Sequence, residues 1–559
     1  MSLIIGIDLG TSTTEAAVFR NGEPEMILNL EGSAVTPSAV GIDETGNWVA
    51  GARAKAQFLL EPEKTAIEVK RKTGLGEKIR LGKAEYDPVE LQGRLLSFVR
   101  QYACAYLGED VRHAVISVPA YFDHIQRMET ILAGERAGFE VERILNEPTA
   151  AAMSYGLEHM DEDSHVLVYD LGGGTFDVTL LEMFSGVLEV KASSGDNQLG
   201  GKDFDEALAE ELVRRFQKKT GVNLKSDRRA MARIKDAAEN CKMELSEREE
   251  AQVLLPAICV KNGKPLEMHE IVSRKEFEAL TKELMERTHA PLETVLDDAG
   301  MEPEDIDQII LVGGSTRMPM VARDIEAFFG KTPASAVHPD YAVASGAAIQ
   351  AGIISGAIDP SEGLVMTDVS AFSLGVRAGD GMGNYDNMSV IIPRNTTIPV
   401  TRKDVFTTSG DGQTRARIEV YQGESRFASR NHFLGEFTIK GIPPARQGKE
   451  QLEVSFMYDM NGMLKVTAII RSTGKQADLE INLMSEGTEM DLSRWKEAPR
   501  AREFRTVIRR AERYLGQNDA AQDRTAAEIQ DYLKRLKEAL LQENDEKIQD
   551  YSGRLEELL

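Results

Sequence analysis

The chain has 559 residues, of which 42% are hydrophobic and 28% are charged, an ordinary composition for a globular protein. Its net charge of −25 argues against binding of a nucleic-acid backbone as the main activity. There is no apolar stretch long enough for a transmembrane helix and no signal-peptide pattern, and the three scattered cysteines predict neither disulfides nor a metal site. We therefore expect a cytoplasmic protein with no nucleic-acid or membrane partner. Its length predicts several domains, because single cores rarely exceed about 250–300 residues.

The first part of the chain, up to about residue 355, alternates strand-like apolar runs with helical patterns. Strands are expected at 113–118, 165–171 and 308–314, and helices at 203–219 and 227–246. Such alternation predicts an α/β architecture.

A second pattern begins near residue 369, where the hydrophobic period becomes two. Leu452, Val454 and Phe456 alternate with other side chains, and an Asn461-Gly462 turn precedes another run of the same kind. These features predict a hairpin within a separate β-domain, which we expect to be a sandwich.

A third pattern begins near residue 490. Apolar residues recur there at spacings of three and four, in runs that start at Ala501, Ala526 and Ile548. The runs predict three amphipathic helices in a small helical appendage. A coiled-coil pairing surface is the alternative.

Two segments about 160 residues apart have the same layout. Residues 4–18 read "IIGIDLGTSTTEAAV" and residues 167–178 read "LVYDLGGGTFDV". In each, an apolar run ends in Asp-Leu-Gly, small polar residues follow, and an alternating run resumes. The repetition predicts a duplicated structural unit.

The glycine turns in these segments allow four interpretations. A Walker loop lacks its Gly-Lys-Ser/Thr, and a dinucleotide turn would open a helix rather than a second strand. A simple tight hairpin and a phosphate-cradling hairpin both remain. The duplication favours the cradle, because Asp8 and Asp170 each end a buried strand and are costly there unless they face a cation such as Mg²⁺.

The order of these motifs carries a resemblance. The two hairpins and "VGGSTRMP" at 312–319 resemble the actin-like ATPase fold. Four further motifs resemble the DnaK or heat-shock-70 chaperone family: "VPAYF" (118–122), "NEPTAAAMSYGL" (146–157), "GDNQLGGKDFD" (195–205) and "NTTIP" (395–399). The resemblance extends to about residue 485. The chain looks most similar to the HscC-like branch.

The resemblance implies a multidomain α/β + β + α fold. Its parts are an actin-like two-lobed ATPase domain at 1–358, an interdomain linker at 359–368, a β-sandwich substrate-binding domain at 369–486 and a short helical lid at 487–559. The implied function is that of an ATP-dependent chaperone, whose slow, partner-stimulated hydrolysis of ATP to ADP closes a cleft on unfolded or extended apolar peptides. A J-domain co-chaperone and a nucleotide exchange factor are the implied partners.

The resemblance also implies which residues bind the nucleotide. Those expected at the phosphates are Gly10, Thr11, Ser12, Thr13, Gly172, Gly173, Gly174, Thr175, Gly200 and Gly201. Adenosine would be held by Glu239, Lys242 and Ser246 from one side and by Gly313, Gly314, Ser315, Arg317 and Asp340 from the other. From the residues alone, Glu239 and Lys242 could be an exposed helical ion pair worth ~0.2–0.5 kcal/mol.

Catalysis and metal binding are implied for a smaller set. Lys70, Glu147, Asp170 and Thr175 would act on the γ-phosphate and its attacking water, while Asp8 and Asp170 would hold Mg²⁺ through water, with K⁺ as a further candidate cation. Without the resemblance, Lys70 would be read as a surface residue of a basic cluster.

The family pattern also implies coupling and peptide-binding residues. Pro119 and Arg127 would relay the nucleotide state, Arg143, Asn146 and Asp368 would receive a J-domain, and Leu364, Val365 and Met366 would form an apolar docking linker that Thr367 interrupts. The peptide cleft would contain Val376, Phe406, Ser409, Ala416 and Ile418. Phe406 and Ile418 could instead be plain sandwich core.

Other functions remain open on the sequence. A small-molecule kinase or a filament-forming protein could share the actin-like core, but neither explains the C-terminal 190 residues. A nucleotide-bound regulatory relative with weak peptide binding is the third alternative.

Overall fold

The computed structural model describes residues 3–157, 159, 163–184, 186–334, 338–359, 365–379, 386–480, 495–496, 498–516, 524–541 and 545–559. The chain forms two compact units. The first comprises Met1–Ala371, Asn395–Val400 and Tyr458–Met463, and the second comprises Phe372–Arg394, Thr401–Met457 and Leu464–Leu559. The finer four-part division expected from the sequence stays a prediction.

The first sheet of the first unit has the strand order β11-β10-β1-β2-β3, with β4 paired to β2. Its strands are β1 Ile4–Leu9, β2 Thr13–Arg20, β3 Glu23–Met26, β4 Val35–Pro37, β10 His113–Val118 and β11 Glu140–Asn146. The side chains of Ile5 and Ile7 on β1 pack in one core with Leu91 and Leu95 of helix α2 (Pro88–Leu107). Helix α3 (His124–Arg136) contributes Ala133 to the same core.

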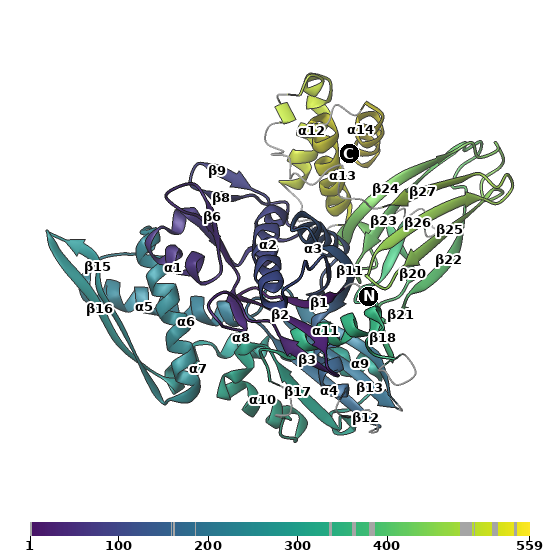
Figure 1. Ribbon diagram of the computed structural model, residues 1–559. Helices are drawn as coiled ribbons and strands as arrows, with labels where there is room; N and C mark the ends of the chain where they lie inside the picture. The colour runs from purple at the N-terminus through teal and green to yellow at the C-terminus, as the bar shows by residue number, and fades with distance from the viewer. Residues whose placement is uncertain are drawn as a thin grey trace. The chain divides into compact units, whose positions relative to one another are not determined.

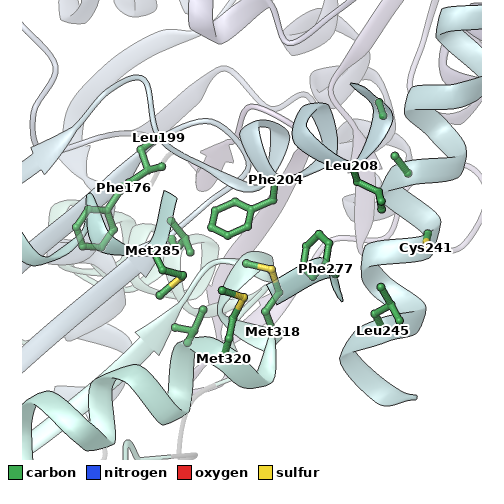
Figure 2. Close-up of a cluster of buried hydrophobic side chains, with 14 of the residues drawn as sticks. Phe176, Leu199, Phe204, Leu208, Cys241, Leu245, Phe277, Met285, Met318 and Met320 are labelled. Atoms are coloured by element: carbon green, nitrogen blue, oxygen red, sulfur yellow. The ribbon is translucent and has the colours of Figure 1, made fainter. Parts of the chain in front are cut away.

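The second sheet of this unit has the order β17-β12-β13-β14-β18-β21. Its strands are β12 Ser164–Leu171, β13 Phe176–Phe184, β14 Val187–Asp196, β17 Gln308–Val312, β18 Val365–Val369 and β21 Thr397–Ile398. Figure 2 shows part of a buried core in which Phe176 of this sheet lies with side chains from helices of the same unit. These helices are α5 Gly201–Thr220, α6 Arg228–Glu247, α7 Arg274–Leu280, α8 Lys282–Glu286, α9 His289–Ala299 and α10 Pro319–Phe329.

Smaller elements complete the first unit. They are the sheet β5 Ala39–Ile42, β6 Trp48–Ala50 and β7 Thr65–Ile67, helix α1 Ala52–Leu60, the pair β8 Ile79–Leu81 and β9 Ala84–Tyr86, and the hairpin β15 Glu250–Lys261 and β16 Lys264–Ser273. Figure 1 shows β15 and β16 as a long ribbon beside α5 and α6. Among the described helices, none is both long and apolar enough to cross a membrane.

Two helices between the sheets pack unusually closely. Helices α4 (Glu147–Gly156) and α11 (Ala342–Ser355) meet where a Cβ on Gly346 would lie well inside 3.0 Å of the Ala150 carbonyl oxygen. A Cβ on Gly6 of β1 would likewise overlap the backbone at Ala347 and Ala348. Glycine therefore permits backbone-to-backbone contact between β1, α11 and α4.

The second unit contains two four-stranded sheets, in the orders β20-β19-β23-β24 and β22-β25-β26-β27. The strands are β19 Leu374–Ala378, β20 Asn387–Ile392, β22 Val400–Thr407, β23 Arg415–Gln422, β24 His432–Lys440, β25 Gln451–Tyr458, β26 Leu464–Ile470 and β27 Gln476–Glu480. Strands β25 and β26 are neighbours, as the Asn461-Gly462 turn predicted. The expected combination of an α/β unit, a β-sandwich and C-terminal helices is confirmed.

Three helices follow the sandwich: α12 Ala501–Leu515, α13 Arg524–Leu541 and α14 Asp545–Leu558. Their apolar faces form one cluster around Ile508, Leu536 and Leu555, which also buries Trp495. The three predicted amphipathic helices are therefore confirmed, and they pack on one another as a bundle.

A buried charged cluster joins this bundle to the sandwich within the second unit. Glu419 of β23 forms ion pairs with three arginines: with Arg377 Nε of β19 at 3.1 Å, with Arg417 Nη2 at 2.9 Å and with Arg535 Nη1 of α13 at 3.3 Å. Asp531 of α13 pairs with both Arg377 (2.9 Å) and Arg535 (3.0 Å).

Aromatic rings enclose the same cluster. The Tyr421 hydroxyl donates to Glu419 at 2.8 Å, and the guanidinium of Arg535 lies 3.9 Å from the Phe433 ring centroid. Burial alone would raise the pKa of Glu419, but the guanidinium groups of Arg377 and Arg535 lower it to about 2. The carboxylate therefore stays charged, and the bundle is held by contacts that are costly to break one at a time.

The Gly346→Ala substitution should destabilise the first unit by about 3 kcal/mol, because the new methyl group would overlap the Ala150 carbonyl. Helix propensity alone predicts the opposite sign, a gain of up to about 1 kcal/mol. Urea unfolding can be followed by Trp48 in a Trp495→Phe background, since the chain has two tryptophans. Ser345→Ala on the same helix is the control; equal stability of the two variants would contradict the close packing.

The Arg535→Met substitution should lower the free energy of unfolding of the second unit by about 3 kcal/mol, since it leaves buried carboxylates with fewer partners. Trp495, buried in the helical cluster, reports this transition in a Trp48→Phe background. Arg500→Met removes the exposed pairs with Glu503 and Asp545 and should change little. If both variants unfold alike, the buried cluster does not hold the bundle.

Candidate functional site

The two repeated segments form matching hairpins in the first unit. In one, β1 and β2 are antiparallel with Asp8 opposite Glu15. In the other, β12 and β13 are antiparallel with Asp170 opposite Asp177. The duplicated unit is confirmed, and the dinucleotide interpretation, which needs a helix after the turn, is excluded by β13.

The tips of the two hairpins lie against each other. A Cβ on Gly174 would lie 2.7 Å from Thr11 Cγ2, and one on Gly173 would overlap Ser12. A Cβ on Gly200 would come within 2.5 Å of the Gly174 nitrogen. Glycine at these positions is therefore a requirement for the approach of three chain segments.

A third turn joins the same point. The Gly172 carbonyl accepts hydrogen bonds from Gly201 N and from Ser315 Oγ, both at 2.9 Å. Gly313, at the end of β17, has φ +84°, and a Cβ there would lie 2.7 Å from Asp170 Oδ1. The predicted strand–turn–helix motif thus ends beside the second hairpin.

A cavity of about 240 Å³ opens at the first hairpin. Thr11 and Ser12 line it together with Glu239 of α6. Its other polar lining residues are Ser38, Lys55, Glu68, Arg71, Lys202, Asp203, Asp205, Glu206, Lys235 and Asp236. Residues expected at phosphate and residues expected at adenosine therefore line one space.

The predicted adenosine residues on α6 have partners on several elements. Glu239 pairs with Lys55 (3.0 Å) and with Lys202 (2.9 Å), and although burial opposes it, these ammonium groups lower the pKa of Glu239 to about 2. Lys242 pairs with Asp205 at 2.8 Å. The alternative of an exposed Glu239–Lys242 pair is therefore wrong.

The remaining predicted adenosine residues divide into two groups. Ser246 Oγ donates to the Lys242 carbonyl at 3.1 Å within α6. Arg317 pairs with Asp340 at 2.6 Å, and Gly314 lies close to the same carboxylate. The structure thus brings Arg317, Asp340 and Gly314 together beside the turn that follows β17.

Lys70 and Glu147 form a buried ion pair. Their side chains are 5% and 9% exposed, and the Lys70 ammonium lies 5.6 Å from the Phe122 ring centroid. The surface interpretation of Lys70 is therefore wrong. A lysine buried with a single carboxylate partner is costly unless further charge balance or function retains it.

Acidic groups gather around this pair. Burial raises the pKa of Asp8 to about 7, and the Glu147 carboxylate adds to the shift. Burial and Glu147 likewise raise the pKa of Asp177 to about 7, and they hold that of Asp170 well above its usual range. Hard cations prefer carboxylate oxygens as ligands, so this cluster is a candidate cation site.

Asp177 has one satisfied and one unsatisfied carboxylate oxygen. One carboxylate oxygen accepts from Tyr121 N at 3.2 Å, while the other is buried with no hydrogen-bond partner. The sequence analysis did not single out Asp177, which lies opposite Asp170 in the second hairpin and is therefore a further candidate site residue. The available signal was an acidic residue inside an otherwise buried strand.

A chain of buried contacts runs from the second hairpin to β18. Beside Tyr121, the Ala120 carbonyl accepts from Arg127 Nη2 at 3.0 Å. Arg127 also donates to Asn146 at 2.6 Å, and Asn146 donates to Asp368 of β18 at 2.8 Å. Predicted relay and J-domain residues thus form one contiguous path.

The other residues predicted to couple the nucleotide to the peptide lie nearby. Pro119 follows β10 and its carbonyl accepts from Phe122 N, while Arg143 donates to Gln350 of α11 at 3.1 Å. In β18, Val365 lies opposite Val187 of β14 and Met366 lies opposite Leu188. Leu364, the other predicted linker residue, lies outside the described residues.

The predicted peptide residues lie in the second unit. Val376 of β19 and Ala416 and Ile418 of β23 are 2%, 9% and 7% exposed, while Phe406 of the other sheet is half-buried. Ser409 is exposed, and its amide donates to Gln413 at 2.8 Å. Burial is also what the sandwich-core alternative expects, so the cleft stays a prediction.

Comparisons of the sequence with a family model and with known proteins point to one protein family. The sequence model of the Hsp70 protein family matches residues 4–80 and 76–559. The chaperone protein DnaK of Thermotoga neapolitana is 46% identical over 495 residues, covering 88% of this chain and 82% of that protein. The DnaK of Thermotoga petrophila is 43% identical over 562 residues, covering 100% and 91%, and that of Thermosipho africanus is 44% identical over 494 residues, covering 88% and 82%.

These relatives confirm the predicted resemblance to the DnaK or heat-shock-70 family, while the HscC-like branch remains a prediction. Both the family match and the identity extend across the two hairpins, the sandwich and the C-terminal helices. The chain belongs to the Hsp70 protein family.

Proposed function

We propose that the protein is an ATP-driven molecular chaperone, which binds unfolded or extended apolar peptide segments and releases them under control of its nucleotide. One observation carries the ATPase part: three turns meet beside a cavity lined by both predicted phosphate and predicted adenosine residues, next to a buried Lys70–Glu147 pair. The relatives' name, chaperone protein DnaK, supports the peptide-binding part.

The glycine turns would hold the phosphates through backbone N–H groups, since missing side chains leave these groups accessible. Thr11, Ser12 and Thr13 would contribute from the first hairpin, and Thr175 from the second. Glu239 and Lys242 would bind adenosine from α6, and Arg317 from the opposite side. The charged partners of Glu239 keep its carboxylate ionised and ready to accept hydrogen bonds.

Lys70 would stabilise the charge that develops on the transferred phosphate. Burial raises the pKa of Asp8 and Asp170, and the positive charge of Lys70 lowers both again. Lys70 therefore lies close to the two carboxylates that are expected at the phosphate. Glu147 holds its ammonium in place and would orient the attacking water. Hydrolysis of this kind depends mainly on positioning and electrostatic stabilisation.

Asp8 and Asp170 would hold Mg²⁺ through water, and the buried oxygen of Asp177 supports a cation requirement at this site. When bound, the metal would neutralise charge on the phosphate oxygens. K⁺ is a second candidate cation for the same group of carboxylates.

Coupling to peptide would pass from Asp177 to Asp368 through buried polar contacts. Asp177 and Arg127 bond the backbone of the adjacent residues Tyr121 and Ala120. Hydrogen bonds then join Arg127 to Asn146 and Asn146 to Asp368. Arg143, Asn146 and Asp368 would receive a J-domain partner, and an exchange factor would reopen the site. Val376, Phe406, Ser409, Ala416 and Ile418 would form the peptide cleft. A small-molecule kinase would need neither the sandwich nor the path to β18.

Steady-state ATP hydrolysis should rise when an unfolded apolar peptide is added, and Lys70→Met should abolish both rates. Loss of transition-state stabilisation predicts a fall of at least about 100-fold in single-turnover hydrolysis. Nucleotide affinity should stay within about tenfold, or about 1.4 kcal/mol.

Lys72→Met is the matched control, because Lys72 belongs to the same basic cluster but its side chain is 45% exposed and pairs with exposed Glu77. The double variant Lys70→Met/Glu147→Gln removes the uncompensated carboxylate and separates misfolding from lost chemistry. A Lys70 variant that hydrolyses ATP at the unaltered rate would remove this residue from the mechanism.

The linker strand should transmit the nucleotide state. Met366 is partly buried against the apolar cluster of β14 and α11, so Met366→Asp opposes docking of β18. We expect ATP to stop accelerating peptide release in this variant, measured with a fluorescent peptide, while ADP binding persists. Val365→Asp is the control, because Val365 is 52% exposed; ATP-accelerated release in the Met366 variant would refute the linker's role.

A further inference from the structure

Gln92 is a buried polar residue that has no part in the proposed mechanism. It lies near the start of α2, beside the core residues Leu91 and Leu95, and is 2% exposed. Its amide nitrogen donates to Thr73 Oγ1 at 2.9 Å. The amide oxygen, Oε1, is buried and has no hydrogen-bond partner among the residues that the structure describes. A buried acceptor left unpaired is costly, so this oxygen points to a further group.

The contact with Thr73 ties Gln92 to the turn that carries Lys70. Lys70 belongs to the 3₁₀ turn Val69–Lys72, and Thr73 follows that turn directly. Thr73 is fully buried, and its backbone amide donates to the Lys70 carbonyl at 3.2 Å. Gln92 therefore holds the main chain of Lys70 through one intervening residue.

A small cavity is shared by Gln92, Lys70 and the first hairpin. Its volume is about 10 Å³, which is about the room that one water molecule needs. Gly10 and Ser38 also line it, and its remaining lining residues are apolar. A water in such a cavity needs polar partners as well as room.

Two of the groups at this cavity can supply those partners. Ser38 Oγ already donates to the Gly10 carbonyl at 2.8 Å, which pairs these two groups with each other. The Lys70 ammonium carries several N–H donors, and the side chains described around it are the Glu147 carboxylate and the Phe122 ring, whose centroid lies 5.6 Å away. One water can therefore accept from Lys70 and donate to Gln92 Oε1.

We propose that Gln92 is a positioning residue for Lys70 in ATP hydrolysis. It holds the Lys70 main chain through Thr73 and the Lys70 ammonium through one water molecule in the small cavity. A water-mediated hydrogen bond is nearly as favourable as a direct one, so the ammonium gains a second anchor besides Glu147. The inference rests on the proposed function, because Gln92 acts on the transferred phosphate only through Lys70.

The test is single-turnover ATP hydrolysis by the full chain. Gln92→Met replaces the amide with an apolar side chain of similar length. It should lower the hydrolysis rate about tenfold, because a displaced ammonium stabilises the transition state less well, while nucleotide affinity stays within about twofold. Gln101→Met, the same substitution at an exposed position of α2, is the matched control and should change neither value. An unaltered rate in Gln92→Met overturns the inference.

A double-substitution cycle separates positioning from a general loss of packing. In a Lys70→Met background, Gln92→Met should change the residual hydrolysis rate by less than about twofold, because no ammonium is left to position. A further fall of about tenfold in that background would mean that Gln92 acts independently of Lys70, and it would overturn the inference.

A crystal structure of the unaltered full chain gives a readout that does not depend on the folding of any variant. We expect an ordered water within hydrogen-bonding distance of both Gln92 Oε1 and Lys70 Nζ, and a cavity without this water overturns the inference. If the water is present but the unaltered chain does not hydrolyse ATP, it is the proposed function that fails.

Discussion

The contact between the tips of two hairpins is the constraint on which the first unit depends. Thr11 and Ser12 lie where side chains on Gly174 and Gly173 would be, and Gly200 meets the same turn. Backbone, not side chains, fills this junction, and a cavity opens beside it that is lined by Thr11 and Ser12 of the first hairpin and by Glu239 of α6. The third turn is tied to it by Ser315, whose hydroxyl bonds the Gly172 carbonyl.

Charge is the second consequence of that convergence. Bringing the strand ends together also brings Asp8, Asp170, Asp177 and Glu147 together in a buried place where Lys70 offers the main compensation. An acidic cluster so arranged stores unfavourable interaction energy that a nucleotide-bound cation can relieve. If the proposed cation binds there, it would stabilise the first unit, since a ligand that binds only the folded state stabilises that state.

Buried polar contacts also hold β18 in the first unit and α13 in the second unit. Arg127, Asn146 and Asp368 lead from the hairpin to β18 through hydrogen bonds that are almost fully buried. In the second unit, Arg377, Glu419 and Arg535 hold α13 on the sandwich in a similar way. Buried polar networks tolerate few alternative arrangements, so each one favours discrete states over gradual deformation.

Much of the architecture could be predicted from local patterns. The strands at 113–118 and 165–171, the helices α5 and α6, the β25–β26 hairpin and the three C-terminal helices follow from hydrophobic period and turn residues. The repeated Asp-Leu-Gly turns likewise predicted two hairpins with paired carboxylates, because a strand followed by glycine and a second alternating run specifies its own local geometry.

The partners of the charged side chains were decided by tertiary structure alone. The local pattern alone would place Lys70 on the surface, whereas its pairing with Glu147, 77 positions away, buries it. Glu239 and Lys242 are three residues apart on one helix, but they pair with Lys202 and Asp205 instead of with each other. Periodicity reports which face of an element is buried, whereas the compensation of a buried charge depends on residues distant in sequence. That is why Asp177 became recognisable as a candidate site residue only when β12 and β13 were paired.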